Sequence, residues 1–418
     1  MIKNEMILTS HKGPKFLLQI FLAFCIVSYL YVALTGTYTM SFIRIKSLLS
    51  QWDLFLNFIF NIAPFIVLFL IYKYFKKKPQ KNIVKLPSSK IIGGILLCAF
   101  VWNILLMLIF DLSVVDGQKG ALAITLPTPL RVLNYFLARI DVQIGCCIYM
   151  AIVNSIRNKF QYLLFGLLFV MSSISHSLGY MAVVFFWFIV LHYDKFQSVF
   201  NKHKLFYVIA IFFIVPLSVK YIYVLRDEIW RDNRGATSNW TTSELLIGRF
   251  VGRLCPYSSS CKIMEEKNDI PRRAQEMQYG IFQYQMHELS YLYSSMVNTS
   301  EYRDYGQMVD KDFKPRFFNL VGVPAVIQIG WYQKSWVGVM NLFTILLFWY
   351  LSFKVSTFFN CERIKDMTFC ILCFMTHNGF YSSLFFSLAV FSFVFLLVNS
   401  ILPIIKRHNE KHINHRSC

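Results

Sequence analysis

The chain has 418 residues, of which 56% are hydrophobic, 17% aromatic and only 15% charged. Soluble domains are closer to half apolar and a quarter charged, so this composition excludes an ordinary soluble protein and places the chain in a lipid bilayer. A formal net charge of +20 would suit nucleic acid. The basic residues, however, gather in short loops between hydrophobic runs, so we expect no nucleic-acid partner.

Hydrophobic runs of about 20 residues, the length of a membrane-spanning helix, recur along the chain. We predict an all-α polytopic integral membrane protein with about ten transmembrane helices. They are expected at 16–34, 54–72, 91–110, 132–154, 161–174, 179–193, 205–224, 336–359, 367–384 and 386–405. The predicted domains are a membrane domain (1–224), a large polar loop (225–335) and a second membrane domain with a tail (336–418).

Lysine and arginine are concentrated at both termini and in the loops 73–90, 155–160, 194–204 and 360–366. Cytoplasmic loops carry such an excess. We therefore expect both termini to be cytoplasmic and the loop 225–335 to lie on the opposite, extracytoplasmic face.

Two predicted spans contain polar residues. Arg139 and Asp141 lie within the fourth span, where charges are costly and often functional; a structural ion pair is the competing interpretation. His176 lies in the polar turn between the short fifth and sixth spans. Such a turn is tolerated only against protein or water, so we expect His176 to line a cavity open to the outer face.

The polar loop is expected to be mostly helical. Apolar residues recur at helical spacing over 243–263 and 275–297. Near 317–333 the chain becomes apolar and contains Gly322 and Gly330. This part is expected to return to the membrane before the eighth span.

Two arginines in the loop, Arg249 and Arg253, are four residues apart and would share one face of a helix. Paired guanidinium groups are suited to a phosphate, which arginine binds in bidentate fashion. Arg226 and Arg231 could extend the cluster. The alternative is an ordinary solvated face paired with nearby carboxylates.

Cys255 and Cys261 are the two cysteines of the loop. In an oxidising compartment they can form a small disulfide ring. Two unpaired thiols are the alternative.

His287 is the best acid–base candidate in the loop, because imidazole titrates near neutrality and the neighbouring Glu288 can orient it. A surface histidine is the competing interpretation. The sequence contains no phosphate-binding glycine-rich loop and no HExxH zinc motif. We expect neither a metal nor another cofactor.

This layout resembles the O-antigen and capsule polymerases (Wzy type) and the related O-antigen ligases of bacterial polysaccharide pathways. The shared features are the many spans, the late extracytoplasmic loop and a Gly-Arg-Leu element at 252–254. A Ser-x-x-Gly-like turn at 175–179 is similar as well, with His176 where that family often has arginine.

The resemblance implies a metal-independent glycosyltransferase of the bacterial inner membrane, with its large loop in the periplasm, acting in lipopolysaccharide or capsule synthesis. The donor would be an oligosaccharide on undecaprenyl diphosphate, and the acceptor the non-reducing end of another lipid-linked unit. A chain-length regulator protein is a further expected partner. Arg249 and Arg253 would hold the diphosphate, Arg226 or Arg231 would assist, His287 would be the base, and Tyr284 would stack on a sugar. His176 and Arg139 would line the cavity below.

Three other classes remain as alternatives. An O-antigen ligase has nearly the same architecture, and sequence alone separates it poorly from a polymerase. A flippase or transporter of lipid-linked units would show more spans and no large outer loop. A membrane acyltransferase usually carries its key residues in early loops or facing the cytoplasm.

Overall fold

The computed structural model describes residues 12–40, 43–109, 127–137, 140–174, 179–202, 257–293, 322–378 and 381–414. Most of these residues lie in helices. In the N-terminal half of the chain the helices are α1 (Lys12–Thr35), α2 (Gln51–Lys76), α3 (Ser89–Ile109), α5 (Thr128–Leu137), α6 (Val142–Val153), α7 (Lys159–Ile174), α8 (Gly179–Leu191) and α9 (Tyr193–Lys202). In the C-terminal half they are α14 (Tyr257–Glu265), α15 (Ile270–Glu276), α16 (Gln283–Tyr293), α17 (Val323–Gln333), α18 (Ser335–Ser356), α19 (Arg363–Asn378) and α20 (Tyr381–Asn414).

Between α1 and α2 the chain forms a short hairpin of β1 (Thr37–Met40) and β2 (Ile43–Lys46), paired antiparallel with Thr37 opposite Lys46. A capping box then starts α2. The Ser50 side chain accepts from the Asp53 backbone N–H at 3.1 Å, and the Asp53 carboxylate accepts from the Ser50 backbone N–H at 3.2 Å. Two N–H groups that the first turn leaves without helical partners are satisfied in this way.

Five described helices are long and apolar enough to cross a membrane: α1, α2, α3, α18 and α20. Three shorter apolar helices, α6, α7 and α8, accompany them. The chain is therefore a helical membrane protein, as predicted. The predicted span 205–224 lies outside the described residues, so the total of about ten spans stays a prediction.

Two predicted spans have the wrong bounds. The continuous helix expected over 132–154 is divided into α5 and α6, because Asp141 adopts an extended conformation and caps α6. Its carboxylate accepts from the backbone N–H groups of Gln143 at 2.9 Å and Ile144 at 3.1 Å. The span expected over 367–384 crosses the boundary between α19 and α20.

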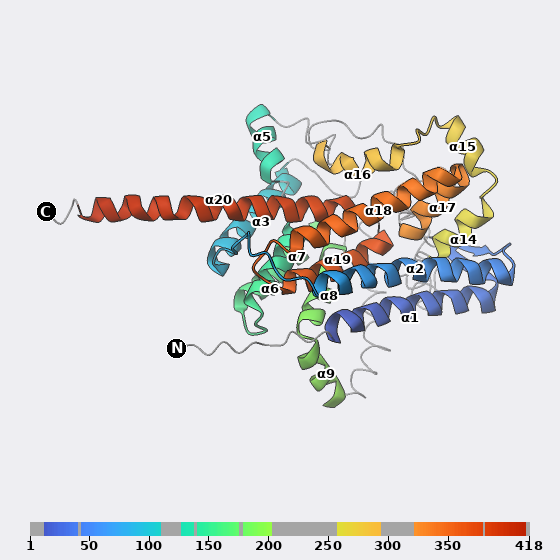
Figure 1. Ribbon diagram of the computed structural model, residues 1–418, viewed down its shortest axis with the longest axis horizontal. Helices are drawn as coiled ribbons and strands as arrows, with labels where there is room; N and C mark the ends of the chain where they lie inside the picture. The colour runs from blue at the N-terminus through green and yellow to red at the C-terminus, as the bar shows by residue number, and fades with distance from the viewer. Residues whose placement is uncertain are drawn as a thin grey trace.

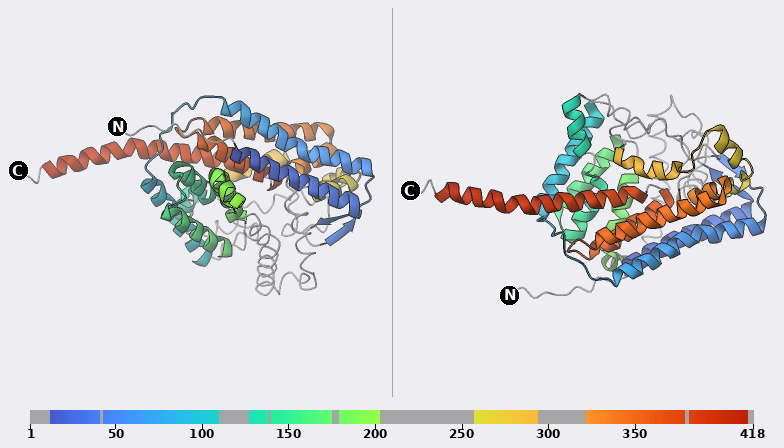
Figure 2. Two further views of the ribbon diagram at one scale, coloured as in Figure 1. Left: turned by 90° about the horizontal axis from the view of Figure 1, so that it is seen from below. Right: turned by 45° about the horizontal axis from the view of Figure 1, so that its top comes forward.

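The long helices lie side by side along the long axis of the molecule, with α2 against α1 and α19, and α18 against α20 (Figure 1). Helices α6, α7 and α8 pack together beside them, as the two views of Figure 2 also show. The start of α1 and the end of α20 point to the same end of the bundle (Figure 1). Helix α20 runs well past its neighbours there.

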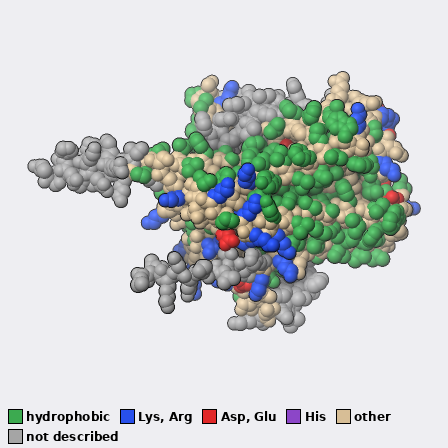
Figure 3. Space-filling view, in the orientation of Figure 1, with side chains coloured by type: hydrophobic (Ala, Val, Ile, Leu, Met, Phe, Trp, Pro, Cys, Tyr) green, Lys and Arg blue, Asp and Glu red, His purple; other side chains and the backbone are tan. Residues whose placement is uncertain are grey.

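The basic loops meet at that same end. The segment after α2 pairs with the turn after α18, with the Lys81 backbone N–H donating to Thr357 O at 2.8 Å and that of Val84 to Phe358 O at 2.9 Å. The Arg363 guanidinium donates to Ala151 O, at the end of α6, at 3.1 Å. Figure 3 shows Lys and Arg gathered beside the hydrophobic surface that covers the other half of this face. The shared end fits the predicted orientation; the side of the membrane it faces stays a prediction.

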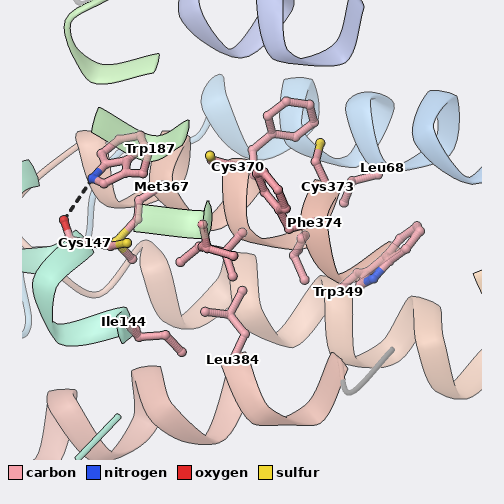
Figure 4. Packing of buried hydrophobic residues seen from close by; sticks show 14 of the residues in the cluster. Leu68, Ile144, Cys147, Trp187, Trp349, Met367, Cys370, Cys373, Phe374 and Leu384 are labelled. Atoms are coloured by element: carbon pink, nitrogen blue, oxygen red, sulfur yellow. Dashed lines mark hydrogen bonds between the residues drawn. The ribbon is translucent and has the colours of Figure 1, made fainter. Parts of the chain in front are cut away.

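The centre of the bundle is apolar and closely packed. Trp187 of α8 is 1% exposed, and its indole N–H donates to the carbonyl of Cys147 at 3.0 Å, so the one polar atom of this large ring is satisfied (Figure 4). Leu68, Met367 and Leu384, from α2, α19 and α20, are fully buried in the same cluster. The cluster thus joins early and late helices into one core.

Helices α17 and α18 form a tight antiparallel hairpin that turns at Lys334. All residues from Val323 to Gly330 are buried, and the Asn341 side chain donates to Val326 O at 3.1 Å across the hairpin. Helix α17 lies along the first half of α18, which is itself a candidate membrane span. The expected return of this apolar, glycine-containing segment to the membrane is consistent with this packing.

Gly330 and Gly338 face each other across the hairpin and permit its close approach. A Cβ on Gly338 would lie 2.7 Å from the backbone N and 2.9 Å from the Cα of Trp331, atoms that cannot move without shifting α17. We expect Gly338→Ala to destabilise the protein by about 1 to 3 kcal/mol through overpacking, measured as a lower thermal midpoint in detergent. The matched control is Gly166→Ala in α7, where a Cβ meets nothing within 4 Å. Equal midpoints for both variants would contradict the tight packing.

Candidate functional site

Helix α2 carries two fully buried amides within its apolar sequence. Asn57 is 1% exposed and Asn61 is 0% exposed. The Asn61 side chain donates to the Asn57 carbonyl at 2.8 Å and to Asn57 Oδ1 at 3.2 Å. Buried amides without partners are costly, so this face of α2 requires polar partners from other helices.

Those partners come from α14 and α17, which lie far along the chain from α2. Asn57 Nδ2 donates to Cys261 Sγ at 3.3 Å, and Gln328 Nε2 donates to Asn57 Oδ1 at 3.1 Å. Ser260 Oγ donates to Gln328 Oε1 at 2.6 Å. We call Asn57, Asn61, Ser260, Cys261 and Gln328 the polar network. It joins two segments of the predicted loop to a membrane helix.

A second polar contact joins α16 to α18. Gln285 Nε2 donates to Asn341 Oδ1 at 3.1 Å and to Thr344 Oγ1 at 3.2 Å. On the same helix, Tyr284 is 2% exposed and Glu288 is 1% exposed. A buried carboxylate and a buried phenol thus lie one helical turn apart, next to the hairpin of α17 and α18.

The C-terminal end of α14 is attached to the β-hairpin and the segment after it. The Glu265 carboxylate accepts from Tyr38 OH at 2.5 Å and from the Leu48 backbone N–H at 2.8 Å. Burial, followed by the adjacent Glu265 carboxylate, raises the pKa of Tyr38, so its hydroxyl stays a donor at any physiological pH. Glu265 therefore attaches this part of the predicted loop to the connection between the first two membrane helices.

The polar network consists of uncharged side chains with amide, hydroxyl and thiol groups. Such groups can exchange hydrogen bonds with sugar hydroxyls, and they can also fix helices against each other. In the structure they bond to one another, which places the loop segments inside the bundle. The polar network is therefore neutral, and anion binding would require cationic groups outside it.

Most of the predicted site residues lie outside the described residues. These are Arg139, His176, Arg226, Arg231, Arg249, Arg253 and Cys255. Their predicted roles, including the Cys255–Cys261 disulfide, stay predictions.

Three predicted residues can be placed. His287 lies in α16 directly before Glu288, although its side chain is not among those described. Tyr284 is buried in α16, so in this conformation its ring packs within the protein. Cys261 is buried in α14 and accepts the hydrogen bond from Asn57.

Sequence reasoning missed the polar network. Asn57 and Asn61 are four residues apart in a predicted span, a spacing that puts both on one helix face and that could have suggested a polar contact. Gln328 likewise interrupts an apolar run. The partners could not have been named, because 204 residues separate Asn57 from Cys261 and 271 separate it from Gln328.

At the opposite end of the bundle, the ring of His192 is 5% exposed and lies against Phe188 at 4.9 Å between ring centroids. Burial, followed by the cations Lys195 and Arg363, lowers the pKa of His192 to about 4. An unfolded histidine has a pKa of about 6.5. Between about pH 4 and pH 6.5, His192 is therefore protonated in the unfolded chain and neutral in the folded protein.

Stability should accordingly fall as the pH drops below about 6.5, by up to about 2 kcal/mol between pH 7 and pH 5. Thermal unfolding in detergent across this range measures the effect. His192→Phe removes the titrating group while keeping an aromatic ring, so its midpoint should depend less on pH. An unchanged pH dependence in His192→Phe would show that other groups cause it.

Among the described residues, no group of three or more His, Cys, Asp or Glu is placed to hold a metal ion. The fold and the polar network define a helical membrane protein in which segments from the long polar region pack between membrane helices. No protein-family model, curated protein or solved structure matches the chain.

Proposed function

We propose that the protein polymerises lipid-linked oligosaccharide repeat units at the outer leaflet of a bacterial inner membrane. In this reaction the bond between the anomeric carbon of the donor glycan and undecaprenyl diphosphate breaks. A bond forms from that carbon to a hydroxyl of a second lipid-linked unit. The acceptor proton passes to a base, and the lipid diphosphate leaves.

The observation that carries the proposal is the integration of the long polar region into the membrane bundle. Helices α14 and α17 are largely buried, and the polar network bonds them to α2. An enzyme whose substrate has a lipid tail and a glycan head needs polar groups next to lipid-facing helices. This arrangement supports such an enzyme better than it supports a tethered soluble domain.

The proposed roles follow the sequence. Arg249 and Arg253 neutralise the diphosphate leaving group, where fixed positive charge is most effective, and Arg226 or Arg231 assists them. His287 accepts the proton of the acceptor hydroxyl, a role that requires a pKa near neutrality. Asn57 and Gln328 hold the loop segments against the spans, so that the site is assembled at the boundary of loop and membrane.

Deletion of the gene in its native host, followed by a gel of surface polysaccharide, tests the proposal. A polymerase deletion leaves lipid core carrying a single repeat unit. Bare core with polymer retained on the carrier lipid would indicate a ligase, and an unaltered ladder would contradict both activities. Complementation with the wild-type gene controls for effects on neighbouring genes.

A further inference from the structure

Helix α16 has an inverted pattern of burial for a helix in a polar loop. Among the side chains of α16 that the structure describes, the buried ones are Tyr284 and Glu288, at 2% and 1% exposure. Its exposed large side chains, Met286 and Leu289, are apolar, at 43% and 39%, and Phe282 directly before the helix is 61% exposed. A helix bathed in water has the opposite arrangement, with its apolar stripe toward the core.

The position of α16 along α18 explains the inversion. Gln285 bonds to Asn341 and Thr344, which lie about 9 to 14 Å along the axis from the first residue of α18 at 1.5 Å per residue. Helix α18 has 22 residues and so matches the roughly 30 Å hydrocarbon core of a bilayer. The contact is therefore well inside the bilayer, and α16 lies alongside the middle of α18 in both Figure 1 and the right view of Figure 2.

Exposed apolar side chains of a membrane span lie at the same depth as the exposed face of α16. On α18, Val339 is 55% exposed and Phe343 is 66% exposed, and both lie at the same depth along the helix as the residues that Gln285 contacts, on another of its faces. A membrane helix directs such side chains toward lipid. Side chains of the same kind on a neighbouring helix at the same depth meet the same solvent.

We propose that α16 is embedded in the bilayer, with Phe282, Met286 and Leu289 in contact with lipid acyl chains and Tyr284, Gln285 and Glu288 facing the protein. The segment thus enters the membrane beside α18. Glu288 is then a carboxylate held at the depth of the hydrocarbon core, where ionisable groups are costly, rare and often functional. This placement does not depend on the proposed polymerase activity.

Photo-crosslinking in phospholipid nanodiscs tests the placement. The full-length protein carries p-benzoylphenylalanine at Met286 or at Leu289, and phospholipid adducts are measured by mass spectrometry after irradiation. Two control positions bracket the result: Phe343 of α18 should report lipid, and Arg272 of α15, with its side chain 60% exposed beside Asp269, should report water.

We expect adduct yields at Met286 and Leu289 equal to that at Phe343 and several-fold above that at Arg272. Yields equal to that at Arg272 would place α16 in water and overturn the proposal. Crosslinks to a second copy of the chain in place of lipid would also overturn it, because the exposed face would then be a protein interface. Using two positions guards against one substitution that disturbs the fold.

Discussion

Replacing Arg249 or Arg253 with alanine should abolish long-chain polysaccharide while the protein remains in the membrane. If both guanidinium groups stabilise the departing diphosphate, loss of either should reduce the rate by about 100-fold or more, the usual effect of removing one fixed donor from a developing charge. Lysine at either position should restore only part of the activity, because an ammonium group cannot bind phosphate in bidentate fashion. The readout is the polysaccharide ladder in a complemented deletion strain.

Arg272→Ala is the matched control for these variants. Arg272 belongs to the same polar region, its side chain is 60% exposed, and it pairs with Asp269 at 2.7 Å on the surface of α15. We expect a normal ladder from this variant. Normal ladders from Arg249→Ala and Arg253→Ala as well would exclude the diphosphate role.

Asp366→Ala should cause one of the largest losses of stability of any single substitution. Asp366 accepts from Lys76 Nζ at 2.8 Å and from Tyr72 OH at 2.7 Å, and the side chains of Lys76 and Asp366 are only 8% and 10% exposed. Removing Asp366 leaves the buried Lys76 with only the half-exposed Glu362 as a counter-charge, 3.5 Å away, and breaking a buried pair in this way costs about 3 kcal/mol or more. Thermal unfolding in detergent measures the loss.

Two further variants distinguish loss of the Lys76–Asp366 ion pair from a general disruption of the fold. Glu362 lies 3.5 Å from Lys76 but its side chain is 48% exposed, so Glu362→Gln should cost less than about 1 kcal/mol. The double variant Lys76→Met, Asp366→Leu replaces both charges with apolar groups and should recover most of the stability. A double variant no more stable than Asp366→Ala would contradict this explanation.

The long spans could be predicted because their signal is local. A run of about 20 apolar residues requires no partner to be recognised, and α1, α2, α3 and α18 lie where the runs place them. The division of the fourth predicted span was missed because hydropathy averages over a window. A single side chain, Asp141, caps the start of α6 there.

The candidate site was harder to predict from the sequence, for a physical reason. The bonds of Asn57 to Cys261 and Gln328 form only after distant segments have packed together. The contact of α16 with α18 was missed on similar grounds: the apolar spacing over 275–297 predicts a helix, but its partners Asn341 and Thr344 belong to a later helix.

Reconstitution of the purified protein tests the proposed activity most directly. The substrate is the undecaprenyl-diphosphate-linked oligosaccharide extracted from a host that lacks this gene, presented in phospholipid nanodiscs with no nucleotide sugar added. We predict a ladder of lipid-linked products of two, three and more repeat units, with release of one undecaprenyl diphosphate for each unit added. An unextended substrate with the folded wild-type protein, or elongation that Arg249→Ala leaves unchanged, would contradict the proposed mechanism.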